Sequence, residues 1–408
     1  MARPFTFAHV SDFHVSTFGD TVHDRLGRRR RSARQADVSD ARWETVWSEA
    51  GWRVLHARGA RPGRLALVDP EGYAHPIPTE RAEGAGASID PVERAAARAC
   101  RLEGRRAVTL AAALPTPGAL DVLLEATPTN TNLRLIRAAT LVDQSDVDMV
   151  LATGDLTEDG DGYELVEAVF RRFLEAGRFA AIPGNHDLYL MPFSGTARPK
   201  PTHASKRARW NEFAEGLRLD VSTSGAWVRH IPEGDAVLVG LDSCARPQRR
   251  FFRHNGAVGP TQLGFLRELA KTDAWRRARH RLVAIHHHVV SLPMGVGRRS
   301  PLELGMRLDD AKEAAEVFDA CGVTLVMHGH RHISEERMPA KSNFRILASP
   351  SLTLGCLSGD GPSFWRVELG DRVHAERVRI PMGAVPTADE DDDAGASETD
   401  GDDMLLDE

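Results

Sequence analysis

A mixed α/β fold is predicted by three features of this 408-residue sequence. Seven short apolar segments have the length and composition of buried strands. Amphipathic helical patterns lie between several of them, and strands that alternate with helices are typical of α/β proteins. Hydrophobic residues make up 42% of the chain and charged residues 27%, so the chain can bury a substantial core.

The predicted strands are brief apolar runs, several of them rich in Val and Ile. They cover residues 5–10, 147–152, 178–183, 236–242, 281–286, 323–328 and 344–349. Apolar residues recur at helical spacing over 163–176 and 310–320, which predicts two amphipathic helices, and residues 157–159 are expected to begin the first. The last segments, 364–369 and 373–380, are expected to be antiparallel strands that close a second sheet.

Residues 20–130 differ in character from the rest of the chain. Turn residues at 61–63 and 69–72 predict a hairpin over 52–78, and a short helix is expected near 91–103. We interpret 20–130 as an insertion that forms a cap or is partly disordered. The main domain is then formed by residues 1–19 and 131–383.

The acidic charge is concentrated at the carboxyl end of the chain. Residues 384–408 hold eleven acidic residues and no Lys or Arg, a composition that predicts a disordered tail. Without those eleven, the formal charge of −6 becomes +5, so the folded body is mildly basic and suits an anionic substrate.

Composition also argues against a membrane-spanning protein and against a disulfide-rich scaffold. No run of 18 apolar residues exists, so no membrane-spanning helix is expected. The four cysteines are scattered, which argues against a disulfide scaffold and fits a reducing cytoplasm, where we expect the protein to reside.

Five of the predicted strands end in residue types that bind metal ions. In chain order these residues are Asp12 and His14, Asp155, Asn185, His286, and His330 with His332. Ligands of open α/β sheets bind outside the carboxyl ends of the strands, so we expect these residues to meet in one crevice. Residues two apart on an extended segment point to the same side, which would bring the two members of each D-x-H or H-x-H pair together.

These ligand types favour a pair of divalent metal ions. Carboxylate oxygens and imidazole nitrogens together suit Mn, Fe, Zn or Ni. One carboxylate can bridge two ions about 3.5–4 Å apart, and Asp155 is the expected bridge, with Asn185 as a neutral oxygen ligand. Two divalent ions, Asp12, Asp155 and a hydroxide leave a single positive charge, which a phosphodiester would neutralise.

Three consecutive histidines follow the strand 281–286. We prefer His286 as the ligand because it directly ends the apolar strand. His287 is the alternative.

The ordered motifs D-x-H, G-D, G-N-H-D, H and G-H-x-H resemble those of the calcineurin-like metallophosphoesterase superfamily. The resemblance covers residues 1–19 and 131–383, and it is greatest to the cyclic-nucleotide and glycerophosphodiester phosphodiesterases. It implies the metallophosphoesterase fold, a four-layer αββα sandwich of two mixed β-sheets, here with an inserted subdomain. Two departures are Val289 and Val290, where that branch usually has prolines, and the long interval from Asp12 to Asp155.

The same resemblance implies roles for individual residues. One metal would be held by Asp12, His14, Asp155 and His332, and the other by Asp155, Asn185, His286 and His330. His186 would act in the transition state as general acid or charge stabiliser, and we expect Asp187 to orient it.

The implied activity is that of a dimetal-dependent phosphoesterase that favours diesters and works by attack of a metal-bridging hydroxide. A phosphomonoesterase or a nuclease of the same fold is the alternative. A non-catalytic scaffold is less favoured, because the full ligand set and His186 are present. The expected partner is a small phosphate ester rather than a membrane, and nucleic acid is not favoured.

Overall fold

The computed structural model describes the greater part of the predicted main domain and pieces of the segment 20–130. The described residues are 3–16, 19, 21, 43–49, 51–57, 64–68, 74–78, 106–112, 114–126, 129–190, 201–245, 254–290, 306–356 and 359–382. The predicted acidic tail and the helix expected near 91–103 lie outside them.

The first sheet has five strands in the order β16-β15-β1-β6-β7. The bounds are β1 Phe5–Val10, β6 Met149–Ala152, β7 Phe179–Ala181, β15 Ser363–Leu369 and β16 Val373–Arg379. Strands β1, β6 and β7 are parallel, and β15 pairs antiparallel with both β1 and β16. The prediction that the last two strands are antiparallel is confirmed, and the sheet that they close is the one that contains β1.

The second sheet has seven strands in the order β13-β14-β12-β11-β10-β9-β8. The bounds are β8 Asp220–Val221, β9 Trp227–Ile231, β10 Ala236–Leu241, β11 His280–Ile285, β12 Leu325–His328, β13 Glu335–Arg337 and β14 Arg345–Ala348. The central strands β10, β11, β12 and β14 are parallel, while β9 and β13 pair antiparallel at the two sides. Both sheets are thus mixed.

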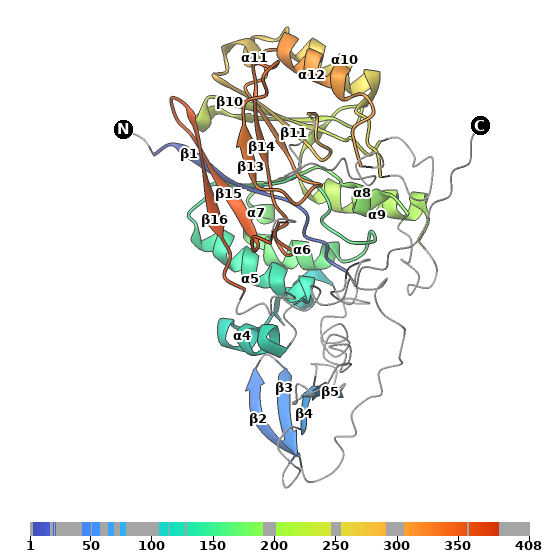
Figure 1. Cartoon of the computed structure of the whole chain (residues 1–408), viewed down its shortest axis with the longest axis vertical. Helices are drawn as coiled ribbons and strands as arrows, with labels where there is room; N and C mark the ends of the chain where they lie inside the picture. Colours follow the sequence, from blue (N-terminus) through green and yellow to red (C-terminus); the bar gives the residue numbers. More distant parts are fainter. Residues whose placement is uncertain are drawn as a thin grey trace, which may run out of the picture.

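Helices cover the outer face of each sheet (Figure 1). On the first sheet lie α5 (Thr131–Gln144), α6 (Tyr163–Val169) and α7 (Arg171–Glu175); on the second lie α10 (Gly259–Leu269), α11 (Asp273–Arg277) and α12 (Ala311–Ala320). A short 3₁₀ helix at Pro232–Gly234 joins β9 to β10.

Alternation along the strands creates three apolar layers. On β10, Val237 and Val239 face the helices, whereas Leu238 joins the cluster between the sheets. A third cluster lies between β1, β6 and the helices that cover them. Side chains of a strand alternate between faces, so three apolar clusters separate four layers. The predicted four-layer αββα sandwich is confirmed.

The predicted helix over 163–176 is interrupted. The chain leaves α6 at Phe170, whose buried ring packs against Phe13 and Phe179, and resumes as α7. Residues 157–159 do not begin a helix, because Gly160 and Gly162 adopt left-handed conformations before α6 starts at Tyr163.

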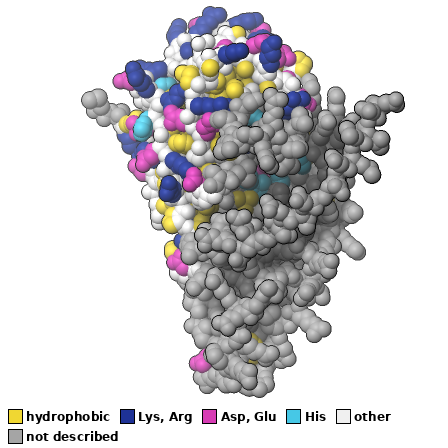
Figure 2. All heavy atoms as spheres, in the orientation of Figure 1, with side chains coloured by type: hydrophobic (Ala, Val, Ile, Leu, Met, Phe, Trp, Pro, Cys, Tyr) yellow, Lys and Arg dark blue, Asp and Glu magenta, His cyan; other side chains and the backbone are white. Residues whose placement is uncertain are grey.

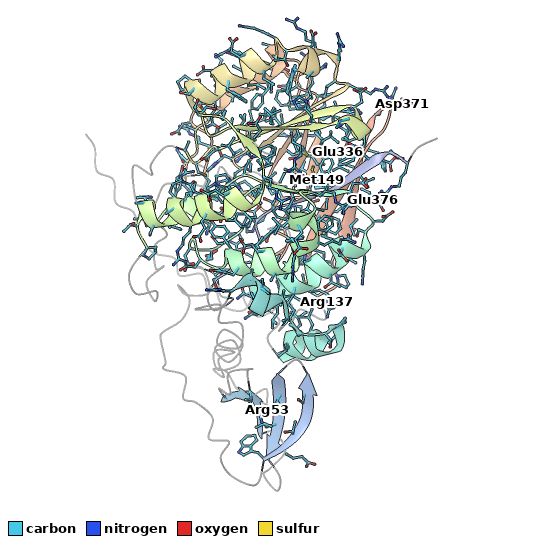
Figure 3. The ribbon with its side chains drawn as sticks, turned by 180° about the vertical axis from the view of Figure 1, so that it is seen from behind. Arg53, Arg137, Met149, Glu336, Asp371 and Glu376 are labelled. Carbon is cyan, nitrogen blue, oxygen red and sulfur yellow. The ribbon has the colours of Figure 1, made fainter. Side chains whose placement is uncertain are left out.

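Part of the predicted insertion is an antiparallel sheet. Its strands are β2 Trp43–Glu49, β3 Trp52–Ala57, β4 Arg64–Val68 and β5 Ala74–Pro78, in that order. The pairing of β3 with β4 matches the predicted hairpin. This sheet lies at one end of the molecule, where Arg53 is labelled in Figure 3.

Two helices of the segment 20–130 pack on the main body. Helix α3 (Ala107–Ala112) contacts α6, and α4 (Pro117–Ala126) contacts α5, beside Arg137 in Figure 3. Their residues Leu110, Leu120 and Leu123 join the apolar cluster of the first sheet. The division into domains stays a prediction. The helices within 107–126 contribute side chains to the apolar core between the first sheet and its helices.

The described part of the chain contains no long apolar helix and no disulfide bond. None of its helices has the length and apolar character needed to cross a bilayer. Its cysteines Cys244, Cys321 and Cys356 are free thiols.

Candidate metal centre

The seven predicted metal ligands lie at the carboxyl ends of strands from both sheets. Asp12 and His14 follow β1, Asp155 follows β6, Asn185 follows β7 and opens α8 (Asn185–Leu188), His286 follows β11, and His330 and His332 follow β12. Histidine side chains reach the surface near the middle of the molecule in Figure 2. The structure therefore brings together side chains that are up to 320 positions apart.

Asp12, His14 and His332 form the first ligand group. The Nε2 atoms of His14 and His332 are 3.0 Å apart, and His332 Nε2 is 3.4 Å from Asp12 Oδ1. Asp12 is fully buried, while the His332 side chain is 18% exposed. This group thus opens toward solvent on the His332 side.

Asp155, His286 and His330 form the second group, with ligand atoms within 4.8 Å of one another. His286 Nε2 lies 3.3 Å from Asp155 Oδ2 and 2.9 Å from Asn185 Oδ1. A third group, His14, Glu158 and His186, shares His14 with the first.

Three of the imidazoles direct one nitrogen into the site and hold the other on an oxygen. His14 Nδ1 contacts Glu158 Oε2 at 2.6 Å, and His286 Nδ1 donates to the Thr153 carbonyl at 2.7 Å. His330 Nε2 donates to the Met306 carbonyl at 2.9 Å. A histidine whose far nitrogen donates presents a lone pair on its near nitrogen.

As a consequence, hydrogen-bond acceptors of the site lie directly against one another. The His286 lone pair meets the oxygens of Asp155 and Asn185, an arrangement that only a proton or a cation between them makes favourable. Imidazole nitrogens with carboxylate and amide oxygens are ligands of borderline divalent metals. The residues present therefore fit divalent metal ions.

The pKa values of the site residues also favour bound cations. Burial lowers the pKa of His14 and of His286, but neighbouring carboxylates outweigh it and raise each to about 9; the main neighbours are Glu158 for His14 and Asp155 for His286. Burial raises the pKa of Asp155, but His286 and His186 overcome that effect and hold it well below the usual value. The carboxylates thus favour added positive charge in their midst.

The backbone at five of the seven predicted ligands is left-handed rather than extended. The φ angles are 55° at Asp12, 51° at His14, 53° at Asp155, 72° at His330 and 47° at His332. The expectation that Asp12 and His14 converge along an extended segment is therefore wrong. Non-glycine residues with positive φ carry strain that is typical of functional sites.

The preceding glycines leave room for this backbone. A Cβ at Gly154 would lie 2.8 Å from the backbone of Gly184, and one at Gly329 would overlap Ser11 Oγ and Asp12 Oδ2. A Cβ at Gly184 would overlap Asp155. The glycine in each motif is needed because the ligand loops touch there.

Gly329→Ala should lower the free energy of unfolding by about 2 kcal/mol, because the methyl group displaces Asp12 or the loop itself. Chemical denaturation measures this loss, and manganese affinity should fall with it. Gly264→Ala on α10 is the control, since nothing lies within 4 Å of its Cβ and it should be neutral or stabilising. Equal stability of Gly329→Ala and wild type would contradict the steric argument.

His286, and not His287, faces the ligand groups. The His287 ring is held at Nδ1 by Ser243 Oγ (2.7 Å) and at Nε2 by the His254 carbonyl (2.7 Å). Both of its nitrogens are therefore engaged away from Asp155. The geometry favours His286 over the alternative.

His186 lies at the edge of the centre, with its side chain 18% exposed. Its ring packs edge-on against His14 at 4.7 Å between centroids, and its Nδ1 is 3.1 Å from Glu158 Oε2. The buried Glu158 carboxylate thus holds both His14 and His186. Sequence reasoning missed Glu158.

Asp187 does not orient His186, contrary to expectation. Its carboxylate accepts hydrogen bonds from the amides of Leu156, Thr157 and Gly184 and from the hydroxyls of Thr157 and Tyr163. These bonds pin the Asp155 loop to the start of α8. Asp187 is therefore a loop-fixing residue, because these partners are backbone amides and hydroxyls rather than the His186 ring.

Lys206 supports the turn that carries Asn185 and His186. It lies on α9 (His203–Gly216), is almost fully buried, and donates from Nζ to the carbonyls of His186 and Tyr189, each at 2.6 Å. Burial lowers its pKa to about 8, opposed by nearby carboxylates, first Asp159. A cation at the end of a short helix satisfies its last carbonyls.

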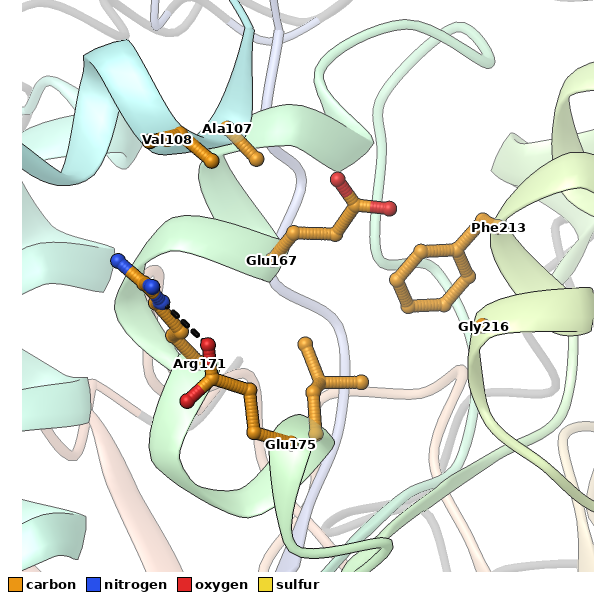
Figure 4. Close-up of a pocket in the computed structure, with 8 residues that line it drawn as sticks. Ala107, Val108, Glu167, Arg171, Glu175, Phe213 and Gly216 are labelled. Carbon is orange, nitrogen blue, oxygen red and sulfur yellow. Dashed lines mark hydrogen bonds and ion pairs between the residues drawn. The ribbon is translucent and has the colours of Figure 1, made fainter.

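A separate cavity of about 210 Å³ lies among α3, α6, α7 and α9 (Figure 4). Its lining residues are Ala107, Val108, Glu167, Arg171, Leu174, Glu175, Phe213 and Gly216. No predicted ligand lines this cavity, so it is distinct from the candidate metal centre.

Comparison with known proteins gives one family match. The family model described as calcineurin-like phosphoesterase matches residues 125–334. A search of curated proteins finds no match.

Solved structures with similar folds have low identity. A dimetal phosphatase from Danio rerio is 14% identical over 93% of this chain and 99% of that chain, with a TM-score of 0.44. A putative 5'-nucleotidase from Staphylococcus aureus is 14% identical over 63% and 50%, with a TM-score of 0.35. A purple acid phosphatase from yellow lupin (Lupinus luteus) is 13% identical over 62% and 48%, with a TM-score of 0.39. This chain spans about half the length of the last two, and likeness at this level says nothing about substrate.

Proposed function

The chain belongs to the calcineurin-like phosphoesterase family, and on that premise we propose that it hydrolyses phosphate esters with two divalent metal ions and favours diesters. The observation that carries the proposal is the meeting of two ligand groups at the carboxyl ends of strands from both sheets. Asp12, His14 and His332 would hold one ion. Asn185, His286 and His330 would hold the other, and Asp155 would be shared.

Bound ions of this kind lower the pKa of water and polarise phosphoryl oxygens. The chain supplies the proton for the leaving group. His186 Nδ1 lies 3.1 Å from Glu158 Oε2, and in its imidazolium form the ring would donate from Nε2 to the departing oxygen. Asp187 and Lys206 keep the turn that bears His186 in place.

Charge balance supports a diester. Asp12 and Asp155 are buried carboxylates of the two ligand groups, and with two divalent ions and a hydroxide they would leave one positive charge. Glu158 lies 3.1 Å from His186, and its charge is balanced when that ring is an imidazolium. A phosphodiester, with one negative charge, neutralises the remaining positive charge. A phosphomonoester dianion would leave the site negative.

The test compares bis-p-nitrophenyl phosphate, p-nitrophenyl phosphate and single-stranded DNA on manganese-loaded protein. The proposal expects kcat/KM for the diester to exceed that for the monoester by about 10-fold or more, as one uncompensated charge implies. A preference for the monoester or the DNA would replace the diesterase with a phosphatase or nuclease. Absence of hydrolysis with metal bound would indicate a scaffold.

A further inference from the structure

His254 lies beside the two functional residues of the α8 turn, although it comes from the other half of the chain. Its Nδ1 is 3.4 Å from Asn185 Nδ2. Its ring is nearly parallel to that of His186, at 13° and 6.3 Å between centroids. The side chain is partly exposed, so the His254 and His186 rings share the open side of the centre.

The backbone at His254 is held by buried groups. Its carbonyl accepts from His287 Nε2 at 2.7 Å, and the next carbonyl, that of Asn255, accepts from Tyr189 OH at 3.0 Å. The ring of His287 also fits against Gly256, where a Cβ would overlap it. The second histidine of the triplet therefore fixes the segment that presents His254.

Hydrogen-bond chemistry then determines which way each group points. Asn185 Oδ1 faces His286 and the second ligand group, so its Nδ2 points outward to His254. An amide NH₂ only donates, so His254 Nδ1 accepts and its proton sits on Nε2. No described residue accepts a hydrogen bond from that Nε2.

We propose that His254 is a second substrate-contacting histidine that also orients a metal ligand. Through Nδ1 it keeps the Asn185 amide turned with its oxygen toward the metal position. Through Nε2–H it donates to an oxygen of a bound phosphate ester, alongside His186. The inference rests on the proposed function, because it needs a phosphate ester at this centre.

Two substitutions separate the two roles. In His254→Asn the amide oxygen takes the place of Nδ1 and can still accept from Asn185, but nothing reaches the position of Nε2. In His254→Gln the amide reaches the position of Nε2, and the acceptor for Asn185 is lost. His374→Asn on the exposed strand β16 is the matched control.

Manganese affinity is measured by calorimetric titration with manganese ions alone, and kcat/KM with bis-p-nitrophenyl phosphate at saturating manganese. We expect His254→Asn to bind manganese like wild type and to lose about 10-fold or more in kcat/KM. His254→Gln should lose about 10-fold in manganese affinity and keep most of its kcat/KM. His374→Asn should match wild type in both.

Two outcomes would overturn the inference. Wild-type values for both His254 variants would show that the ring has no part in either task. Equal losses of manganese affinity and of kcat/KM in both variants, with an unchanged melting temperature, would show that Nδ1 and Nε2 of His254 do not have separate roles. A wild-type protein that binds manganese but hydrolyses no ester would instead defeat the proposed function, and the manganese titrations would still test the Asn185 role.

Discussion

Asp155→Ala should remove bound metal and lower kcat/KM for a phosphodiester by about 10³-fold or more. The Asp155 side chain is 2% exposed; Oδ2 lies 3.3 Å from His286 Nε2, and Oδ1 accepts from the His186 amide at 2.7 Å. Its loss would therefore deprive the second ligand group of its carboxylate and release the α8 turn. Metal content after manganese loading and the rate on bis-p-nitrophenyl phosphate measure the two effects.

The control for this substitution is Asp146→Ala. Asp146 has a similar left-handed φ of 49°, but its side chain is 81% exposed and pairs with Arg3 at the surface. Asp146→Ala should bind metal and hydrolyse the diester like wild type. The comparison therefore distinguishes the loss of a metal ligand from the loss of an aspartate with a strained backbone. Two metal ions per chain in Asp155→Ala would contradict the role of Asp155 as the shared ligand.

The positions of the ligand side chains could be predicted because each follows a buried parallel strand. Strand polarity brings the ends of β1, β6 and β7 in one sheet and of β11 and β12 in the other to the same side of the sandwich, and the apolar runs that form these strands are visible in the sequence. Local conformation at those ends was not predictable in the same way. From the sequence, Asp12 and His14 are expected to continue β1. Their left-handed backbone conformation depends on contacts with loops that are distant in the sequence.

The partner of His186 could not be found from neighbours in sequence. Asp187 is adjacent, but the α8 turn directs its carboxylate to the amides of the Asp155 loop. Glu158 reaches His186 from a loop 28 positions earlier. His254 lies 68 positions after His186, and no motif marks either residue. Such pairs depend on how loops fold back on one another, which periodicity does not encode.

His186→Ala should lower kcat on the diester by about 10²- to 10⁴-fold and leave manganese content near that of wild type. His186 belongs to neither the Asp12 nor the Asp155 ligand group; with Glu158 and His14 it forms a third group, and its side chain is 18% exposed. The variant therefore loses the proton donor and keeps the ligands. Metal analysis and single-turnover rates test both parts. Loss of metal would make His186 structural.

The Glu158→Gln substitution, made both in the wild-type protein and in the His186→Ala variant, tests how His14 and His186 share the Glu158 carboxylate. Glu158 Oε2 is 2.6 Å from His14 Nδ1 and 3.1 Å from His186 Nδ1, so its removal should lower both metal affinity and kcat. In the His186→Ala background the effect on kcat at saturating manganese should vanish, because its target is gone, while the loss of affinity through His14 should persist. Additive losses of kcat in the double variant would mean that Glu158 does not act through His186.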